Sequence, residues 1–215
     1  MRASPVVAIT LLLTLTSCTP SSSLRPVIDL AQQVSGKTGA SQTQINIIPA
    51  FSYLRVQIGN RVAFFVLGYL DPHPEGMVEV WFSAEKEVLR LRHGRLMGVS
   101  GTPTEWLNVT YPRAPAWSNT LAAATYERTR DVAPGYRYGL AETVQLRSIS
   151  APEKSNLLGI PPESLSWFLE SSTDQAALKP TLYALRHDQD GPRVVYSETC
   201  LDTDLCFSWQ RWPAN

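Results

Sequence analysis

The sequence predicts a mainly β protein, either an antiparallel sandwich or an open, barrel-like meander, with one short helix near the N-terminus. Three observations predict this fold class. About ten segments alternate apolar and polar residues, and short turns rich in Gly, Pro, Asn and Asp join them. Helical patterns do not alternate with these segments, as they would in a parallel βα fold. Finally, 16 prolines, 8 tyrosines and 6 tryptophans are typical of turn-rich β-structure.

The first element is a targeting segment over residues 1–17. Arg2 is followed by an apolar run from Val6 to Leu15, about half the ~20 residues that a transmembrane helix needs. The run ends in Leu15-Thr16-Ser17-Cys18, which resembles the bacterial lipobox, a signal that is cleaved before a cysteine that becomes acylated. We therefore expect Cys18 to be lipidated. The alternative is an ordinary secretory signal with an incidental cysteine.

The second element, residues 18–25, is rich in serine and proline and is expected to be a flexible tether. Thr19 follows the cysteine, and no Asp is there to resemble the inner-membrane retention signal. We therefore expect a bacterial protein anchored by lipid to the outer membrane, with its folded domain in the periplasm.

Residues 26–215 are expected to form a single mainly β domain, with a possible subdivision in the proline-rich stretch 151–162. Apolar residues at helical spacing predict the short helix over residues 27–34. Beyond it, Gly59-Asn60 and His93-Gly94 lie between strand patterns and predict hairpin turns, because these residue types accept a positive φ.

The remaining cysteines flank a five-residue turn between two strand patterns. Cys200 and Cys206 would be directly opposed in such a hairpin, at a separation that a disulfide accepts. An oxidising periplasm permits this bond. A two-thiolate metal site is the alternative, but no histidine is nearby in the sequence and zinc normally takes four ligands. We therefore expect a structural disulfide.

Composition and motifs narrow the functions. Lys plus Arg equals Asp plus Glu at 19 each, so the sequence lacks the basic surplus of a nucleic-acid-binding protein. It holds no phosphate-binding loop, HExxH motif or calcium loop, so we expect no cofactor, no metal site and no catalytic residues. His73, His93 and His187 lie in turn sequences typical of solvated surface groups. On a strand, Glu85 and Glu87 would share one face and could act as a carboxylate pair, but the segment SAEKEV is more typical of a polar turn between strands.

A set of short motifs carries a family resemblance. These motifs are Ile48-Pro49, Leu54-Arg55-Val56, Gly59, Phe82-Ser83-Ala84-Glu85, Arg92 to Leu96, and Gly101-Thr102-Pro103. Together with the hairpin sequence YALRHDQDGPRVVYS, they resemble the YjbF/GfcB family of lipoproteins. The resemblance implies a protein encoded with capsule or exopolysaccharide secretion genes that assists assembly or export of the polymer. It brings no catalytic residues, and the Cys200–Cys206 segment departs from the family pattern.

The expected function is therefore that of a non-enzymatic outer-membrane lipoprotein, assisting capsule or exopolysaccharide assembly or export. Its partners would be the outer membrane, through the lipid, and either export or assembly proteins or the polysaccharide itself. The candidate contact residues are Trp81, Glu85, Arg92, His93, Arg95 and Trp106. Sugar rings stack on exposed indoles, although tryptophans also commonly pack a core. Two alternatives remain: a periplasmic glycan-modifying hydrolase using Glu85 or Glu87, and a purely structural envelope lipoprotein.

Overall fold

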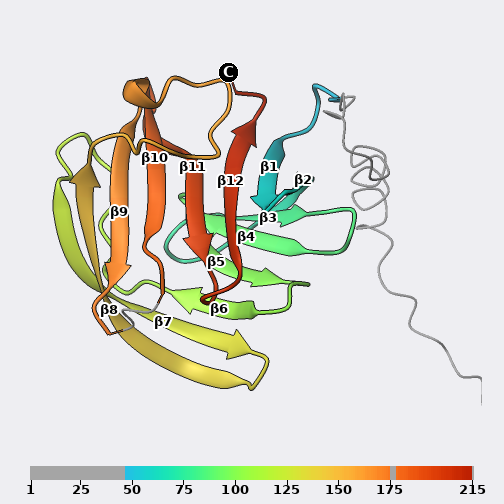
Figure 1. Cartoon of the computed structure of the whole chain (residues 1–215), viewed down its shortest axis with the longest axis vertical. Coiled ribbons are helices and arrows are strands. Elements are labelled where there is room, and N and C mark those ends of the chain that lie inside the picture. The colour runs from blue at the N-terminus through green and yellow to red at the C-terminus, as the bar shows by residue number, and fades with distance from the viewer. Residues whose placement is uncertain (1–46, 175–177, 215) are drawn as a thin grey trace, which may run out of the picture.

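Twelve antiparallel strands close into a barrel in the computed structural model, which describes residues 47–174 and 178–214 (Figure 1). The strands are β1 (Tyr53–Ile58), β2 (Arg61–Asp71), β3 (Val78–Phe82), β4 (Val88–Arg92), β5 (Arg95–Ser100), β6 (Glu105–Thr110), β7 (Ala123–Ala133), β8 (Arg137–Ile149), β9 (Ser166–Ser172), β10 (Thr181–Asp188), β11 (Gly191–Cys200) and β12 (Cys206–Trp212). Each strand pairs with the next along the chain, and β12 pairs with β1. The mainly β, antiparallel meander is confirmed.

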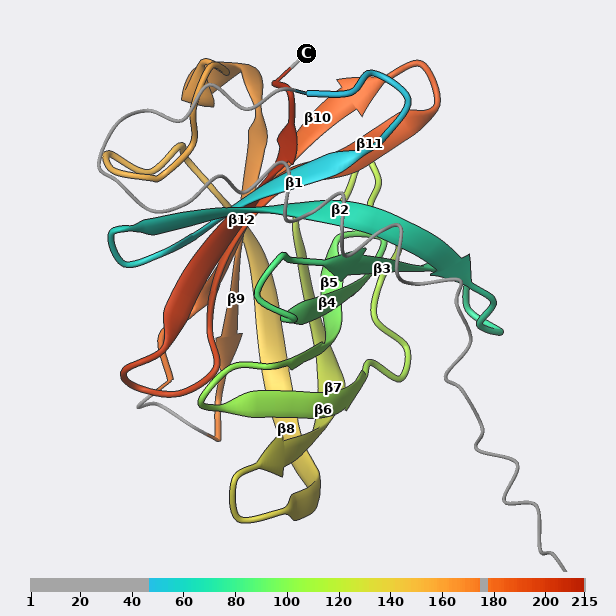
Figure 2. The same ribbon diagram turned by 90° about the vertical axis from the view of Figure 1, so that its right-hand side faces the viewer.

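Closure of the sheet is the feature that distinguishes the fold from the open meander or sandwich expected. β1 and β12 pair over six residues, from Tyr53 opposite Trp212 to Ile58 opposite Phe207. Figure 2 shows the two strands side by side where the sheet closes. Closure removes both sheet edges, which would otherwise present unpaired backbone groups.

The N-terminal predictions fall outside the described residues. The signal segment 1–17, Cys18, the tether 18–25 and the helix over 27–34 all precede residue 47. Within the described ranges, helical structure is limited to the single 3-10 turn η1 (Pro162–Ser164). The described residues therefore contain no helix that is long and apolar enough to cross a membrane.

The barrel interior is packed with large apolar side chains. Along β1, Leu54 and Val56 point inward, and along β12 Phe207 and Trp209 do the same, as the period of two along a strand requires. Burying each such side chain contributes about 1.5–3 kcal/mol. The interior is therefore a filled core.

A cluster of buried ions also crosses the interior, between β7, β8 and β9. Arg128 donates from Nε to Glu142 and from Nη1 to Glu170, each at 2.8 Å. Arg130 donates to the same oxygen of Glu142, and the hydroxyl of Tyr126 donates to Glu170. Burial alone would lower the pKa of Arg128, but the two carboxylates outweigh it and raise that pKa. Hereafter these five residues are called the ion cluster.

The stretch 151–162, where the sequence allowed a subdivision, lies against the outer face of the barrel. Leu157 and Ile160 pack there with Trp167 and Tyr196. The side-chain amide of Gln210 on β12 accepts from the backbone N–H of residue 158 at 3.0 Å and donates to its carbonyl at 2.7 Å. These contacts attach the loop to β9–β12.

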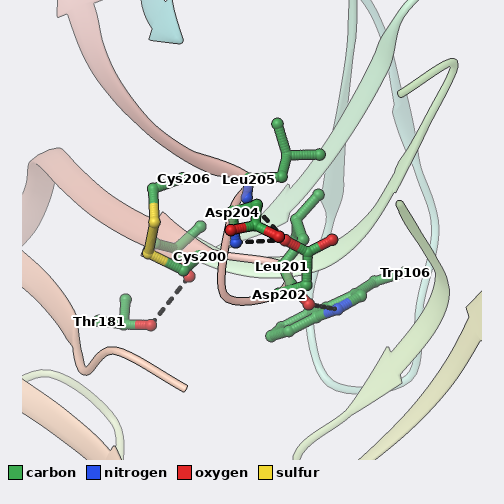
Figure 3. The surroundings of a disulfide bond; sticks show 9 residues. Trp106, Thr181, Cys200, Leu201, Asp202, Asp204, Leu205 and Cys206 are labelled. Carbon is green, nitrogen blue, oxygen red and sulfur yellow. Dashed lines mark hydrogen bonds between the residues drawn. A yellow bond between two sulfur atoms is a disulfide. The ribbon is translucent and has the colours of Figure 1, made fainter. Parts of the chain in front are cut away.

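The disulfide between Cys200 and Cys206 is confirmed (Figure 3). The two residues are directly opposed at the end of the β11–β12 hairpin. Asp202 stabilises the turn between them, because its Oδ1 accepts the backbone N–H groups of Asp204 at 2.8 Å and Leu205 at 2.6 Å. The turn is thus held both by the covalent bond and by an aspartate cap.

The double substitution Cys200→Ser, Cys206→Ser is expected to lower the free energy of unfolding by about 2 kcal/mol, since cross-linking so short a loop restricts the unfolded chain only modestly. Urea unfolding monitored by tryptophan fluorescence would measure this as a lower midpoint. The wild-type protein under reducing conditions should lose the same amount, and the variant should not respond to reductant. An unchanged midpoint would contradict a stabilising role for the bond.

Candidate functional site

A large cleft lies at the barrel end formed by the β2–β3, β4–β5, β6–β7 and β10–β11 connections. Its volume is about 700 Å³, which is in the range of ligand-binding clefts. Five arginines line it: Arg92, Arg95, Arg113, Arg193 and Arg211. Hereafter it is called the arginine cleft.

Charge is unevenly distributed between this cleft and the rest of the chain. The arginine cleft holds five arginines against two glutamates, Glu75 and Glu79. The whole chain, by contrast, balances 19 basic against 19 acidic residues. A concave surface lined mainly by one sign of charge focuses its potential, so the arginine cleft is suited to attract anions.

The β4–β5 hairpin builds the inner wall of the arginine cleft. Its two-residue turn has positive φ at both His93 (49°) and Gly94 (78°), which confirms the predicted turn. The turn places Arg92 and Arg95 directly opposite each other, and both side chains are buried. A Cβ on Gly94 would lie 2.3 Å from Cβ of Val194, so only glycine allows the hairpin to approach β11 this closely.

Two of the cleft arginines are already paired. Arg92 forms an ion pair with Glu75 at 2.5 Å and donates to Nδ1 of His73 at 2.8 Å. Arg211 donates from Nη2 to both carboxylate oxygens of Glu79, at 2.8 and 3.0 Å. These contacts neutralise both glutamates of the cleft.

Arg95 differs from these two arginines, because its side chain is buried and two of its nitrogen atoms lack a hydrogen-bond acceptor among the described residues. Its residue is 5% exposed, and neither Nε nor Nη2 has a hydrogen-bond partner among the described residues. Instead, its guanidinium carbon lies 4.0 Å from the ring centroid of Trp117 and 5.8 Å from that of Tyr126. The indole N–H of Trp117 donates to the carbonyl of His93 at 2.7 Å, which fixes the ring under the guanidinium.

The six contact residues expected from the sequence therefore lie in three different places. Arg92, His93 and Arg95 come together in the arginine cleft. Trp81 and Trp106 are each only 1% exposed and pack inside the barrel, the arrangement that the sequence left open as the alternative. Figure 3 shows the indole of Trp106 directed at the β11–β12 turn, where it donates to the carbonyl of residue 201. Glu85 lies in the β3–β4 turn, at the other end of β4.

The carboxylates Glu85 and Glu87 form a brace across the β3–β4 turn. Arg61 on β2 donates to both, and Ser83 donates to Glu87. Burial would raise the pKa of Glu87, but the hydrogen bonds from Ser83 and Arg61 outweigh burial and hold that pKa below its ordinary value. A glycosidase needs a general acid with a raised pKa, so Glu87 is poorly suited to that role.

Sequence reasoning missed Trp117, Arg193 and Arg211. Trp117 lies in the segment PRAPAWSN, which reads only as an interruption between strands. The two arginines occupy alternating positions in strand patterns and become neighbours of the β4–β5 hairpin only when the barrel closes. Among the residues that the structure describes, no cluster of His, Cys, Asp and Glu could hold a metal ion.

Fold and cleft together define the chain as a small closed-barrel domain with an arginine-lined opening at one end. The family model described as group 4 capsule polysaccharide lipoprotein gfcB, YjbF, matches residues 28–174, more than half of the 215-residue chain. The chain therefore belongs to the YjbF family, which confirms the resemblance found in the sequence.

One similar solved structure is the crystal structure of the hypothetical lipoprotein YmcC from Escherichia coli (K12). The two share 16% sequence identity and superpose with a TM-score of 0.60, over 93% of this chain and 99% of that chain. At this identity the likeness concerns the fold. The curated proteins contain no match to the chain.

Proposed function

We propose that the chain is a lipid-anchored outer-membrane protein that assists capsule or exopolysaccharide assembly or export from the periplasmic side. It acts by binding the polymer or an assembly or export protein. One observation supports the binding role above others: the arginine cleft is large, positively charged and built on a closed sheet. Membership of a family described as capsule polysaccharide lipoproteins supports the process in which it acts.

The proposed anchor is Cys18. The lipobox-like Leu15-Thr16-Ser17-Cys18 supports acylation, and Thr19 in place of Asp supports the outer membrane as the destination. One acyl chain gives marginal binding to a bilayer, whereas two or more hold a protein there stably. The anchor would keep the barrel, and with it the arginine cleft, close to the site of export.

Binding is proposed rather than hydrolysis because of how the carboxylates are used. Glu75 and Glu79 in the arginine cleft are paired with Arg92 and Arg211. Glu85 belongs to the brace in the β3–β4 turn, away from the cleft. A general acid or base must reach the substrate, and these carboxylates instead hold arginine side chains, so this arrangement favours holding a ligand over cleaving it.

A deletion strain complemented with wild-type protein or with Cys18→Ala tests the proposal. We expect the deletion to reduce the secreted or surface-bound polysaccharide, and only the acylatable form to restore it. A third complementing gene, in which an ordinary secretory signal replaces residues 1–18, delivers the unanchored domain to the periplasm and serves as a control for export of the variant. Polysaccharide that stays at the wild-type amount in the deletion strain would refute the proposed role.

A further inference from the structure

The arginine cleft contains guanidinium groups whose positive charge is not paired with a carboxylate of the described residues. The two glutamates of the cleft form ion pairs with Arg92 and Arg211. Arg113 lies 3.8 Å from the carboxylate of Glu127, and both of these side chains are mostly exposed. Arg95 and Arg193 have no ion pair among the described residues. Two guanidinium groups in the cleft are thus available to anions.

Arg95 is the stronger of these two anchors. Burying a guanidinium without hydrogen-bond acceptors is unfavourable, and the contact with the Trp117 ring offsets only part of this. A carboxylate accepts two parallel N–H bonds from a guanidinium, and such bonds are strong where water is excluded. The Arg95 side chain is already buried against the Trp117 ring, so it has less conformational freedom to lose when an anion binds than an exposed arginine would.

Arg193 extends the positive surface beside Arg95. Arg193 lies on β11 directly before Val194, the residue that packs against Gly94 of the β4–β5 turn. Partial burial and then the charge of Arg211 lower the pKa of Arg193. Arg193 itself is exposed, so it can meet a ligand at the mouth of the cleft while Arg95 meets it inside.

The rest of the lining suits the apolar faces of sugar rings. Leu70 and Met77 are exposed large side chains of the cleft lining, and Ala114 and Pro115 of the β6–β7 connection add further apolar surface to it. The C–H faces of a pyranose pack on such surfaces, while its charged substituents seek guanidinium groups. A volume of about 700 Å³ accommodates a short oligosaccharide rather than a lone anion.

We propose that the arginine cleft binds an acidic saccharide, with one carboxylate of the sugar chain paired with Arg95 and a neighbouring carboxylate near Arg193. This rests on the proposed function and deepens it, because it names the class of polymer that the protein handles: a polysaccharide that contains uronic acid or other carboxylated sugars.

Calorimetric titration of the acylated full-length protein in nonionic detergent tests the inference. The probes are a short oligomer of galacturonic acid, its methyl ester, which has the same size without charge, and sodium acetate, which carries the anion without the sugar. We expect the acidic oligomer to bind at least about tenfold more tightly than the ester or acetate, and its affinity to fall as salt is raised.

Two variants and a control locate the binding. Arg95→Met keeps much of the side-chain volume and should weaken binding of the acidic oligomer at least about tenfold. Arg193→Ala removes an exposed side chain, so folding should be unaffected while binding weakens severalfold. Arg147→Ala removes an exposed arginine of β8 outside the cleft and should bind as the wild type does. If Arg95→Met fails to fold, Arg193→Ala decides the question.

Equal binding of the ester, equal binding of acetate, or wild-type affinity in both cleft variants would overturn the inference. The deletion experiment and the binding experiment test the cellular role and the ligand class independently. If deletion abolishes the polymer but the acidic oligomer does not bind, the role in export stands and the ligand class is wrong. If the oligomer binds through Arg95 but deletion leaves the polymer unchanged, the chemistry of the cleft stands and the cellular role is wrong.

Discussion

Substitution of Arg128 by methionine is expected to lower the free energy of unfolding by about 3–5 kcal/mol, the range for breaking a buried ion pair on one side. Arg128 joins Glu142 to Glu170 inside the barrel. Without it, Glu142 keeps Arg130, but Glu170 retains, among the described residues, only the hydrogen bond from the hydroxyl of Tyr126. A buried carboxylate with one neutral donor is poorly compensated.

Equilibrium unfolding in guanidinium chloride measures this loss, with Arg147→Met as the matched control. Arg147 is exposed on β8, so its substitution should change stability by no more than about 0.5 kcal/mol. Adding Glu170→Gln to Arg128→Met removes the orphaned charge and should recover part of the loss. A loss below about 1 kcal/mol for Arg128→Met would show that the ion cluster contributes little to the folded state.

The substitution Gly94→Ala is expected to cost about 2–4 kcal/mol, since two effects add. A non-glycine residue at a φ of 78° is strained, and the new methyl group overlaps the side chain of Val194, whose Cβ would be 2.3 Å away. Because Val194 is branched at that atom and sits in a strand, it cannot rotate out of the way.

Thermal and urea unfolding of Gly94→Ala should be compared with Gly59→Ala. Gly59 has a similar positive φ of 55°, but a Cβ there would meet nothing within 4 Å. Gly59→Ala should therefore cost only about 1 kcal/mol, from backbone strain alone. Adding Val194→Ala should relieve part of the overlap in Gly94→Ala. Equal losses at the two glycines would mean that the contact with β11 has no energetic role.

Local chemistry made most of the strands and turns predictable. The hairpins at Gly59-Asn60 and His93-Gly94 and the disulfide between Cys200 and Cys206 each depend on residues close in sequence, and all were confirmed. Closure of the barrel was not predictable in this way, because β1 and β12 lie at opposite ends of the described chain. Neither strand has a sequence pattern that identifies the other as its partner.

The ion cluster was missed for a different reason. In β7 the side chains of Tyr126, Arg128 and Arg130 alternate inward, so the buried face of the strand carries two charged residues, as many as the opposite face with Glu127 and Asp131. The rule that apolar residues face the core therefore does not identify the buried face in this part of the strand. The carboxylates of Glu142 and Glu170, which compensate the charge of these buried arginines, come from other strands and are not indicated by the β7 sequence.

The arginine cleft was partly predictable. Arg92, His93 and Arg95 belong to one hairpin, so a local motif drew attention to them together. Their aromatic neighbour Trp117 and the distant Arg193 come from other parts of the chain. The sequence does not indicate that these segments are neighbours, because their proximity depends on the arrangement of the strands around the closed barrel.

The packed interior sets a limit on how the molecule can handle a long polymer. Between the two barrel ends lie the indoles of Trp106 and Trp209, the ring of Tyr183 and Arg128, which leave no room for a water molecule. A sugar chain cannot thread from one end to the other, so whatever enters the arginine cleft leaves by the same mouth. In the proposed role, the domain would therefore bind and release a stretch of polymer at this single opening rather than pass the polymer through its own barrel.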